Sequence, residues 1–452
     1  MNKTIAVLLT GAIATSLLAC AAPDNSVSQD SAVSDTVASQ DSGNQEATSE
    51  PYTLHWIHQY TQDAPLIGTI EAVIDKYQKE VNPSLIYEAE YIPDTEAYYS
   101  KVKTLIASGE MPSMFWGDPD SFTLGLREQG LLYNVGELID GLELSDRFLP
   151  ITYEYPKYED GSLYAMAVGA NVSYFHYHKD MFEAAGITEK PTTWDDFFEA
   201  CEKLKASGVT PIASSGDTWY ILRWAAFIPY RISGNAYIDS VVKGEKSWNS
   251  EEAVKMGEFA QKVTQYWPEG WAGIDSSTAR DLFLSKQAAI WYYPVSTSIA
   301  YITDDNLELT DDYDYFLLPT LEGYDATAPT DCFANSGKGI FMSKEFMEDN
   351  EEEKKRFVKF FIENFGDAAL EKHFSSGILP SHTENVSDFQ QHIYDDFANV
   401  SPSDYAHCWD VVIDSVSNET LKAETINLFT GDITIDEWCS IMNKTIAENV
   451  GG

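Results

Sequence analysis

Residues 52–118 decide the fold class: YTLHWIHQYTQDAPLIGTIEAVIDKYQKEVNPSLIYEAEYIPDTEAYYSKVKTLIASGEMPSMFWGD. The segment 52–58 is rich in aromatic and β-branched residues, which predicts a buried strand. Residues 67–81 carry apolar side chains at helical spacing, and residues 85–92 alternate as a strand. A second helix over 98–109 then precedes a short strand over 112–118. This alternation of strands and helices predicts a parallel sheet with helices on its faces.

The same alternation returns further along the chain. Helices are expected over 194–207, 251–266 and 351–365, and a strand is expected over 209–214. Roughly 400 residues follow the N-terminal segment, too many for one small core and enough for two domains of ordinary size. The sequence therefore predicts an α/β protein with two lobes.

The N-terminal fifty residues are expected to lie outside this fold. Residues 1–19 have one early charge and a short apolar run, which is typical of a secretory signal peptide. Leu17-Leu18-Ala19-Cys20 resembles the lipobox of bacterial lipoproteins, in which the cysteine is lipidated, so Cys20 is the expected lipid anchor. Residues 20–50 have no aromatic residue and no positive charge, and they are predicted to form a disordered tether. The alternative is an ordinary cleaved signal peptide followed by a disordered N-terminus.

The net charge excludes some classes of binding partner, whereas the cysteines leave open whether the protein has disulfides. A formal net charge of -43 excludes a protein that binds the phosphate backbone of nucleic acid. It also argues against adsorption to anionic lipid, so membrane contact is expected through the anchor only. Beyond Cys20, the four cysteines are far apart and show no metal-type spacing. They form either two disulfides or four buried thiols.

Catalytic and metal-binding templates are absent from the sequence. It contains no GxSxG, no phosphate loop and no HExxH. The acidic stretch 304–308 lacks the glycine of a calcium loop, so it is interpreted as a solvated turn. His176 and His178 lack a third ligand and are interpreted as polar strand-edge residues. No cofactor and no metal are expected, although 72 acidic residues leave a glycosidase pair open.

Aromatic residues gather where the predicted strands end. Trp56, Trp116 and Trp219 each end or follow a strand, and the carboxyl ends of parallel strands line a ligand crevice. Polar residues accompany them: His58, Gln59, Asp118, Asp120 and Asp217. Aromatic rings stack on the C–H faces of a sugar while amides and carboxylates pair with its hydroxyls. Because no Arg or Lys stands at these strand ends, the pattern favours a sugar over a phosphate or an amino acid.

Several motifs then resemble, in order, the extracellular solute-binding proteins of carbohydrate ABC importers, the class that includes maltose-binding protein. The resemblance covers most of the chain after the tether. The most specific block is YHKDMFEAAGITEKPTTWDDFFEACEKLKASG at 177–208. The others are SKVKTLIASGEMPSMFWGDPD at 100–120, ARDLFLSKQAAIWYYP at 279–294, YDYFLLPTLEG at 313–323 and SSGILPS at 375–381.

This resemblance implies two discontinuous α/β lobes that close on a ligand by a hinge. The crossovers are expected near Gly169, Asp314 and Ser343. The N-terminal lobe would then comprise residues 51–169 and 314–343, and the C-terminal lobe 170–313 and 344–452. The implied sugar contacts are Trp56, His58, Trp116, Asp118, Asn171, Asp217, Trp219 and Trp409. Gln59 is a further candidate because it is a polar residue beside the end of the first strand.

The stretch QAAIWYYPVS at 287–296 adds a tenth candidate. In the predicted strand, Trp291 and Tyr292 are interior and are expected to pack against helices. Tyr293 ends the strand and is expected to touch the ligand. His178, Lys286 and Ser296 depart from the family's pattern, and Ser296 replaces a stacking tryptophan. The identity of the sugar is therefore not transferable from maltose binders.

Together these observations predict a monomeric, non-enzymatic binding protein, anchored on the outer face of the bacterial cytoplasmic membrane. It would capture a mono- or oligosaccharide between its lobes and deliver it to the permease subunits of an ABC importer. The alternative is a surface-anchored glycoside hydrolase that uses paired carboxylates such as Asp118 and Asp217. A peptide-binding protein is a weaker alternative, because the sequence shows no charged clamp.

Overall fold

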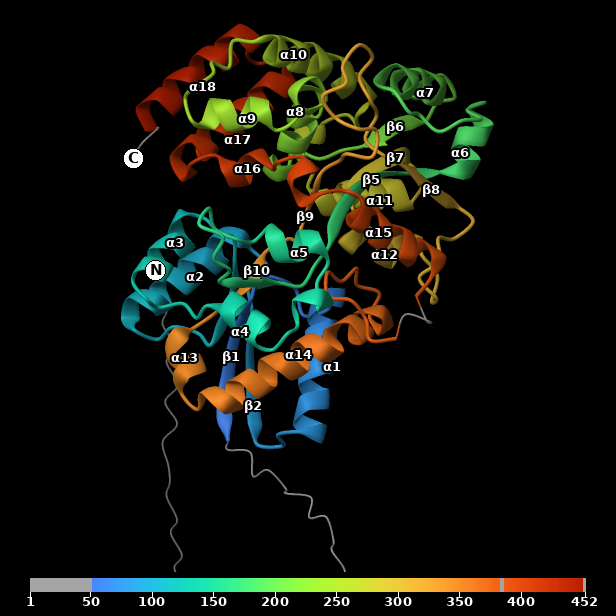
Figure 1. Ribbon diagram of the computed structural model, residues 1–452. Helices are drawn as coiled ribbons and strands as arrows, with labels where there is room; N and C mark the ends of the chain where they lie inside the picture. The colour runs from blue at the N-terminus through green and yellow to red at the C-terminus, as the bar shows by residue number, and fades with distance from the viewer. Residues whose placement is uncertain (1–50, 383–385, 450–452) are drawn as a thin grey trace, which may run out of the picture. The chain divides into compact units, whose positions relative to one another are not determined.

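The computed structural model of the protein describes residues 51–382 and 386–449 (Figure 1). The predicted signal peptide, Cys20 and the tether lie outside these residues. The described chain forms two hydrophobic cores, each built on its own five-stranded sheet. We call these parts the first lobe and the second lobe. No helix within the described ranges is long and apolar enough to cross a membrane.

The first lobe is built on a sheet of mixed direction. Its strand order is β2 (Leu85–Tyr91), β1 (Tyr52–His58), β3 (Met114–Gly117), β10 (Gly339–Met342) and β4 (Ala165–Ala167). The strands predicted at 52–58, 85–92 and 112–118 are confirmed as β1, β2 and β3, and β1 pairs in parallel with both of the others. β10 runs antiparallel between β3 and β4.

Local capping explains where the helices of this lobe begin and end. Asp94 accepts a hydrogen bond from the backbone N–H of Ala97 at 2.8 Å, and Gly109 ends the same helix in the left-handed region at φ 79°. The helices of the first lobe are α1 (Pro65–Glu80), α2 (Thr95–Ser108), α3 (Ser121–Glu128), α4 (Val135–Gly141), α13 (Lys344–Glu348) and α14 (Glu351–Glu371). Figure 1 shows α14, in orange, beside α1, in blue, although the two helices are far apart in the sequence.

The second lobe is built on the sheet β6 (Thr210–Ala213), β7 (Ala288–Pro294), β5 (Asn171–His178) and β8 (Tyr313–Phe316), and β9 (Ala334–Asn335) also pairs with β5. Its helices are α6 (Lys179–Ala184), α7 (Trp194–Ala206), α8 (Thr218–Ser233), α9 (Ala236–Val242), α10 (Glu251–Val263), α11 (Ser276–Leu284), α12 (Val295–Ile302), α15 (Asp388–Asn399), α16 (Trp409–Val412), α17 (Ser415–Thr430) and α18 (Ile435–Asn449). The start predicted for α7 is confirmed, because Thr193 and Asp196 form a capping box.

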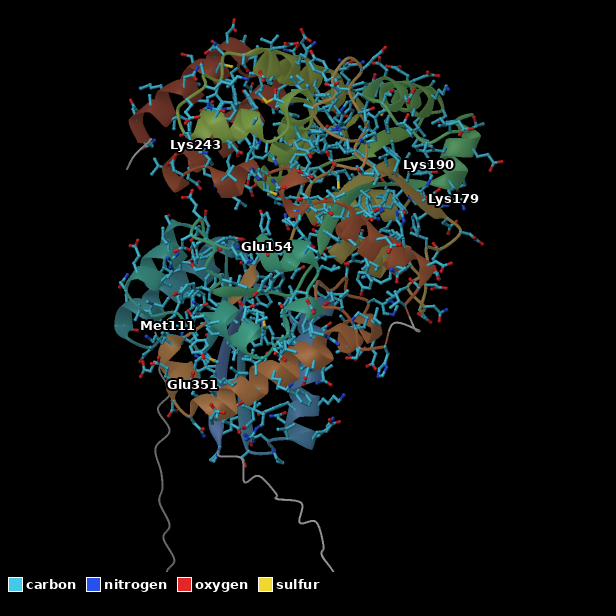
Figure 2. The ribbon with its side chains drawn as sticks, in the orientation of Figure 1. Met111, Glu154, Lys179, Lys190, Lys243 and Glu351 are labelled. Atoms are coloured by element: carbon cyan, nitrogen blue, oxygen red, sulfur yellow. The ribbon has the colours of Figure 1, made fainter. Side chains whose placement is uncertain are left out.

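Strand pairing corrects two of the predicted lobe boundaries. Tyr313–Phe316 pairs with β5, so the chain is still in the second lobe at Asp314. Lys190, which precedes α7 and is labelled in Figure 2, forms an ion pair with Asp314 at 2.7 Å that ties this strand to the loop before α7. Residues 344–371 were assigned to the second lobe from the sequence, yet α14 buries Phe357 and Phe361 in the first core. An alternating strand and an amphipathic helix show which face is buried but not which core buries it.

Three segments join the lobes. Residues 168–170 connect β4 to β5, and residues 336–338 connect β9 to β10. The third segment runs between Ile378, in the first core, and Phe389, in the second core. The helix α5 (Pro150–Glu154) lies beside the first two crossings, since it contacts both β4 and β9.

Candidate functional site

Three predicted ligand contacts are core residues in this structure. Trp56, His58 and Trp116 are completely buried, and the rings of Trp56 and Trp116 stack with their centroids 5.9 Å apart. The indole N–H of Trp116 donates to His58 Nδ1 at 3.2 Å, so Nδ1 carries no proton. The proton of the neutral ring is therefore on Nε2, which donates to the Tyr87 hydroxyl at 2.7 Å. Burial lowers the pKa of His58 to about 3. The prediction that these rings face a ligand is therefore wrong for the conformation described here.

Trp409 is also a core residue. Only 3% of its surface is exposed, and its ring packs against Trp248 at 5.4 Å and Tyr237 at 6.4 Å. Its neighbour Asp410 points elsewhere and binds Arg223, as described below. In this turn Trp409 packs in the core, whereas the Asp410 side chain is partly exposed.

The remaining candidates of the first lobe lie in a polar cluster. Its members are partly exposed side chains, and we call it the first-lobe cluster: Gln59, Tyr60, Tyr99, Asp118 and Lys338. Lys338 Nζ donates to Gln59 Oε1 at 2.7 Å and to the Tyr99 hydroxyl at 2.8 Å, and it lies 4.0 Å from Asp118 Oδ2. Gln59 is held in turn by the Thr95 hydroxyl at 2.8 Å. The cluster thus offers an oriented ammonium and a nearby carboxylate.

Burial dominates the electrostatics of this cluster. It raises the pKa of Asp118 to about 6, an effect that Lys338 opposes and that the negative charges of Asp120 and Asp410 reinforce. Burial likewise lowers the pKa of Lys338, and the three carboxylates oppose that change. Asp118 is thus poised to gain or lose a proton near neutral pH.

The second lobe contributes a comparable group of side chains. We call it the second-lobe cluster: Asp217, Trp219, Arg223, Tyr293 and Asp410. The rings of Trp219 and Tyr293 are partly exposed and meet edge to face, 5.6 Å apart. Asp217 Oδ2 accepts from the backbone N–H of Ser276 at 2.6 Å and also from its hydroxyl, so this carboxylate fixes the start of α11.

A second ion pair completes this cluster. Arg223 follows Trp219 by one turn of α8, so the two side chains share a helix face. Its Nη1 atom binds Asp410 Oδ1 at 2.7 Å, and the two side chains are 9% and 21% exposed. Burial would lower the pKa of Arg223, but Asp410 raises it well above its ordinary value.

Asn171 is the first residue of β5, directly after the first crossing segment. Its Nδ2 donates to Asn335 Oδ1 at 3.2 Å, whereas its own buried Oδ1 has no hydrogen-bond partner within the described chain. A Cβ at Gly337 would come within 3.0 Å of Asn171 Nδ2, and Gly337 has a φ of 65°, so this turn requires glycine. Asn171 Oδ1 is therefore a buried acceptor that no described group satisfies.

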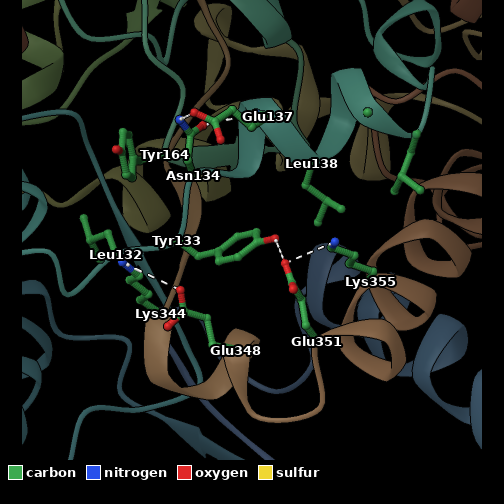
Figure 3. Close-up of a pocket in the computed structure, with 12 residues that line it drawn as sticks. Leu132, Tyr133, Asn134, Glu137, Leu138, Tyr164, Lys344, Glu348, Glu351 and Lys355 are labelled. Atoms are coloured by element: carbon green, nitrogen blue, oxygen red, sulfur yellow. Dashed lines mark hydrogen bonds and ion pairs between the residues drawn. The ribbon is translucent and has the colours of Figure 1, made fainter.

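A hollow of the described surface lies elsewhere, on the first lobe (Figure 3). It measures about 540 Å³ and lies against α4, α13 and α14. Its charged groups already bind one another: Glu351 accepts from the Tyr133 hydroxyl and pairs with Lys355 at 3.1 Å. None of the ten predicted ligand contacts lines it.

The histidines and cysteines left open by the sequence have structural surroundings. His176 Nε2 lies 2.8 Å from the Ser298 hydroxyl, and His178 Nε2 lies 2.8 Å from the carbonyl oxygen of Phe283. Both rings are buried, so the interpretation as strand-edge residues is wrong. Cys201, Cys332, Cys408 and Cys439 are free and buried. Within the part of the chain that the structure describes, no group of three His, Cys, Asp or Glu residues could hold a metal ion.

Sequence reasoning missed Tyr60, Tyr99, Lys338, Arg223 and Asp410. Lys338 stands between two glycines, Gly337 and Gly339, where the backbone approaches its neighbours closely. This pair of glycines is the local sequence signal that the backbone is closely approached in this segment. Arg223 and Asp410 are 187 residues apart and carried no such signal.

The architecture defines a two-lobe α/β binding protein, and comparisons with known proteins identify the family. A family model described as "Bacterial extracellular solute-binding protein" matches residues 63–364, more than half of the chain. The chain belongs to this family.

One curated relative is the sn-glycerol-3-phosphate-binding periplasmic protein of Brucella abortus (strain 2308), which is 31% identical over 156 residues. The match covers 32% of this chain and about a third, 34%, of that relative. Among solved structures, a chitin oligosaccharide binding protein is similar with a TM-score of 0.74 and 24% identity, over 89% of this chain and 100% of that one. A structure from work on xylan utilization by Caldanaerobius polysaccharolyticus has the same TM-score at 21% identity, over 87% and 99%. At these identities the two structures show the fold alone.

Proposed function

We propose that this protein captures an uncharged oligosaccharide between its two lobes and delivers it to the permease subunits of an ABC importer, without catalysis. The observation that carries the proposal is the pair of partly exposed rings, Trp219 and Tyr293, beside the hydrogen-bonding groups of the second-lobe cluster. Rings of this kind stack on the apolar faces of sugar rings, and neighbouring polar groups pair with hydroxyls. Asn171 and the first-lobe cluster supply further donors and acceptors.

The proposal extends to the membrane. Cys20 would carry the lipid, and residues 20–50 would hold the lobes at the outer face of the cytoplasmic membrane. This part rests on the lipobox-like sequence. It predicts that Cys20→Ala releases the protein from the membrane fraction into the medium, measured by immunoblot of the two fractions. Retention of the variant in the membrane fraction would contradict the anchor.

A titration tests the proposed ligand. The purified protein is titrated in a calorimeter with N,N′-diacetylchitobiose, xylobiose and raffinose, and separately with sn-glycerol 3-phosphate. We expect at least one oligosaccharide to bind and no sugar to be cleaved, as checked by chromatography of the titrated mixture. Binding of none of the three sugars contradicts the proposal, and release of shorter sugars indicates a hydrolase.

Lys338 and Arg223 favour a second candidate, a solute with a phosphate or carboxylate group. The sequence shows no Arg or Lys at the strand ends, yet the structure places Lys338 and Arg223 beside predicted ligand contacts, and the curated relative is named for glycerol 3-phosphate. However, each cation faces a carboxylate, Asp118 or Asp410. An anionic ligand would have to compete with these carboxylates, so we rank it second.

A further inference from the structure

The gap between the charged atoms of Lys338 and Asp118 is the right size for one small polar group of a ligand. Their charged atoms, Nζ and Oδ2, are 4.0 Å apart, too far for a direct hydrogen bond. Both side chains are partly exposed, at 23% and 26%, so a ligand can reach them. A hydroxyl oxygen about 2.8 Å from each atom would fit the gap, since typical hydrogen-bond lengths span it.

The hydrogen bonds that Lys338 and Asp118 already make also favour a hydroxyl group at this position. An ammonium group has three donors, and Lys338 uses two of them on Gln59 and Tyr99. No hydrogen bond within the described residues reaches the carboxylate of Asp118. One free donor therefore faces one free acceptor. A hydroxyl group satisfies both, because it accepts one hydrogen bond and donates another.

The surrounding charges decide between a hydroxyl and an anion. Lys338 interacts electrostatically with the carboxylates of Asp118, Asp120 and Asp410, and the positive charge of Lys422 acts in the opposite direction. A carboxylate or a dianionic phosphate of a ligand has no proton to give to Asp118, and the Asp118 carboxylate would repel it at close range. Like charges brought together in a partly buried site cost several kcal/mol, as a general magnitude.

We propose that Lys338 and Asp118 act as a specificity pair that binds one ligand hydroxyl and excludes an anionic group from the same position. This inference rests on the proposed function, which it refines. It makes Asp118 a selectivity residue rather than an acid catalyst. Lys338 binds the ligand, while Gln59 and Tyr99 are positioning residues that hold the ammonium in place.

The test compares Asp118→Asn and Lys338→Met with the unmodified protein. Each is titrated with the sugar that binds best among diacetylchitobiose, xylobiose and raffinose, and with sn-glycerol 3-phosphate. We expect Asp118→Asn to weaken sugar binding about tenfold, the effect of one hydrogen bond to a charged group. It should also strengthen glycerol phosphate binding at least tenfold. Lys338→Met should weaken both ligands. A thermal melt of each variant checks that it is folded.

Asp120→Asn is the matched control. It removes the same charge two residues away, and asparagine can replace aspartate as the N-cap of α3. We expect its ratio of sugar to phosphate affinity to change less than threefold. The inference is overturned if Asp118→Asn leaves this ratio unchanged, or if both asparagine variants shift it equally. Failure of the unmodified protein to bind any of the three sugars overturns the proposed function itself, and the inference falls with it.

Discussion

Replacing Trp219 and Trp56 by alanine, one at a time, separates the ligand site from the core. Trp219 is partly exposed at the edge of the second core, and its ring meets those of Tyr220 and Tyr293 edge to face, at 5.3 and 5.6 Å. Loss of a ring that stacks on a ligand costs about 1–3 kcal/mol, roughly a 5- to 150-fold rise in Kd. Because little packing is lost, we expect the free energy of unfolding to fall by less than about 1 kcal/mol.

Trp56 should show the opposite pattern. It has no exposed surface and packs between His58, Trp116 and Phe361. Its replacement by alanine leaves a cavity, and we expect a loss of about 3–5 kcal/mol in the free energy of unfolding. Urea denaturation followed by circular dichroism measures stability, and calorimetry measures the Kd for the best-binding sugar. An unchanged Kd for Trp219→Ala, combined with a stability loss like that of Trp56→Ala, would refute the assignment of Trp219 to the site.

Three further predictions concern charge, a buried cation and the thiols. Asp118 has a folded-state pKa of about 6, above its ordinary value of 3.8. The folded state therefore binds more protons in that window, and ionisation of Asp118 should cost about 1–3 kcal/mol of stability as pH rises from 4 to 7. Asp118→Asn should remove this cost, measured by urea denaturation at pH 4, 5, 6 and 7; an unchanged pH profile would contradict the shift. Arg231 is buried and donates to four oxygens of the 318–328 segment, including Pro319 O at 3.0 Å and Ala328 O at 2.8 Å. Arg231→Met should cost about 3 kcal/mol or more in urea denaturation, with little recovery in Arg231→Lys, because one ammonium cannot reach all four acceptors. The four cysteines of the second lobe should react with a thiol reagent only after unfolding, and a mass that indicates a disulfide in the native protein would contradict this.

Periodicity predicted the elements well because it depends on local burial. The strands at 52–58 and 288–293 and the helices at 67–81 and 194–207 are all confirmed within a few residues. Within β7, Trp291 and Tyr292 are completely or almost completely buried, whereas Tyr293 is partly exposed, which agrees with the predicted division of that stretch. Position along the strand accounts for these outcomes, because Trp291 and Tyr292 lie inside β7 and Tyr293 lies near its end.

The lobe boundaries and most of the site could not be predicted in this way. Position at the end of a strand suggested that Trp56 faces a crevice, but α14, almost 300 residues later, supplies the Phe361 ring that packs against it. The same physical limit applies to Lys338, which meets Gln59 across 279 residues of sequence. Local sequence patterns carry no information about contacts between residues so far apart in the chain. Only the tertiary structure identifies the two polar clusters.

The central claim is that this protein binds an uncharged oligosaccharide. Its most direct test is calorimetric titration of the purified protein at pH 7 with diacetylchitobiose, xylobiose and raffinose, with glycerol 3-phosphate as the comparison. The account predicts saturable binding of at least one sugar, weakened in Trp219→Ala, and weaker binding of glycerol 3-phosphate than of that sugar. Saturable binding of glycerol 3-phosphate with no heat from any sugar would contradict it.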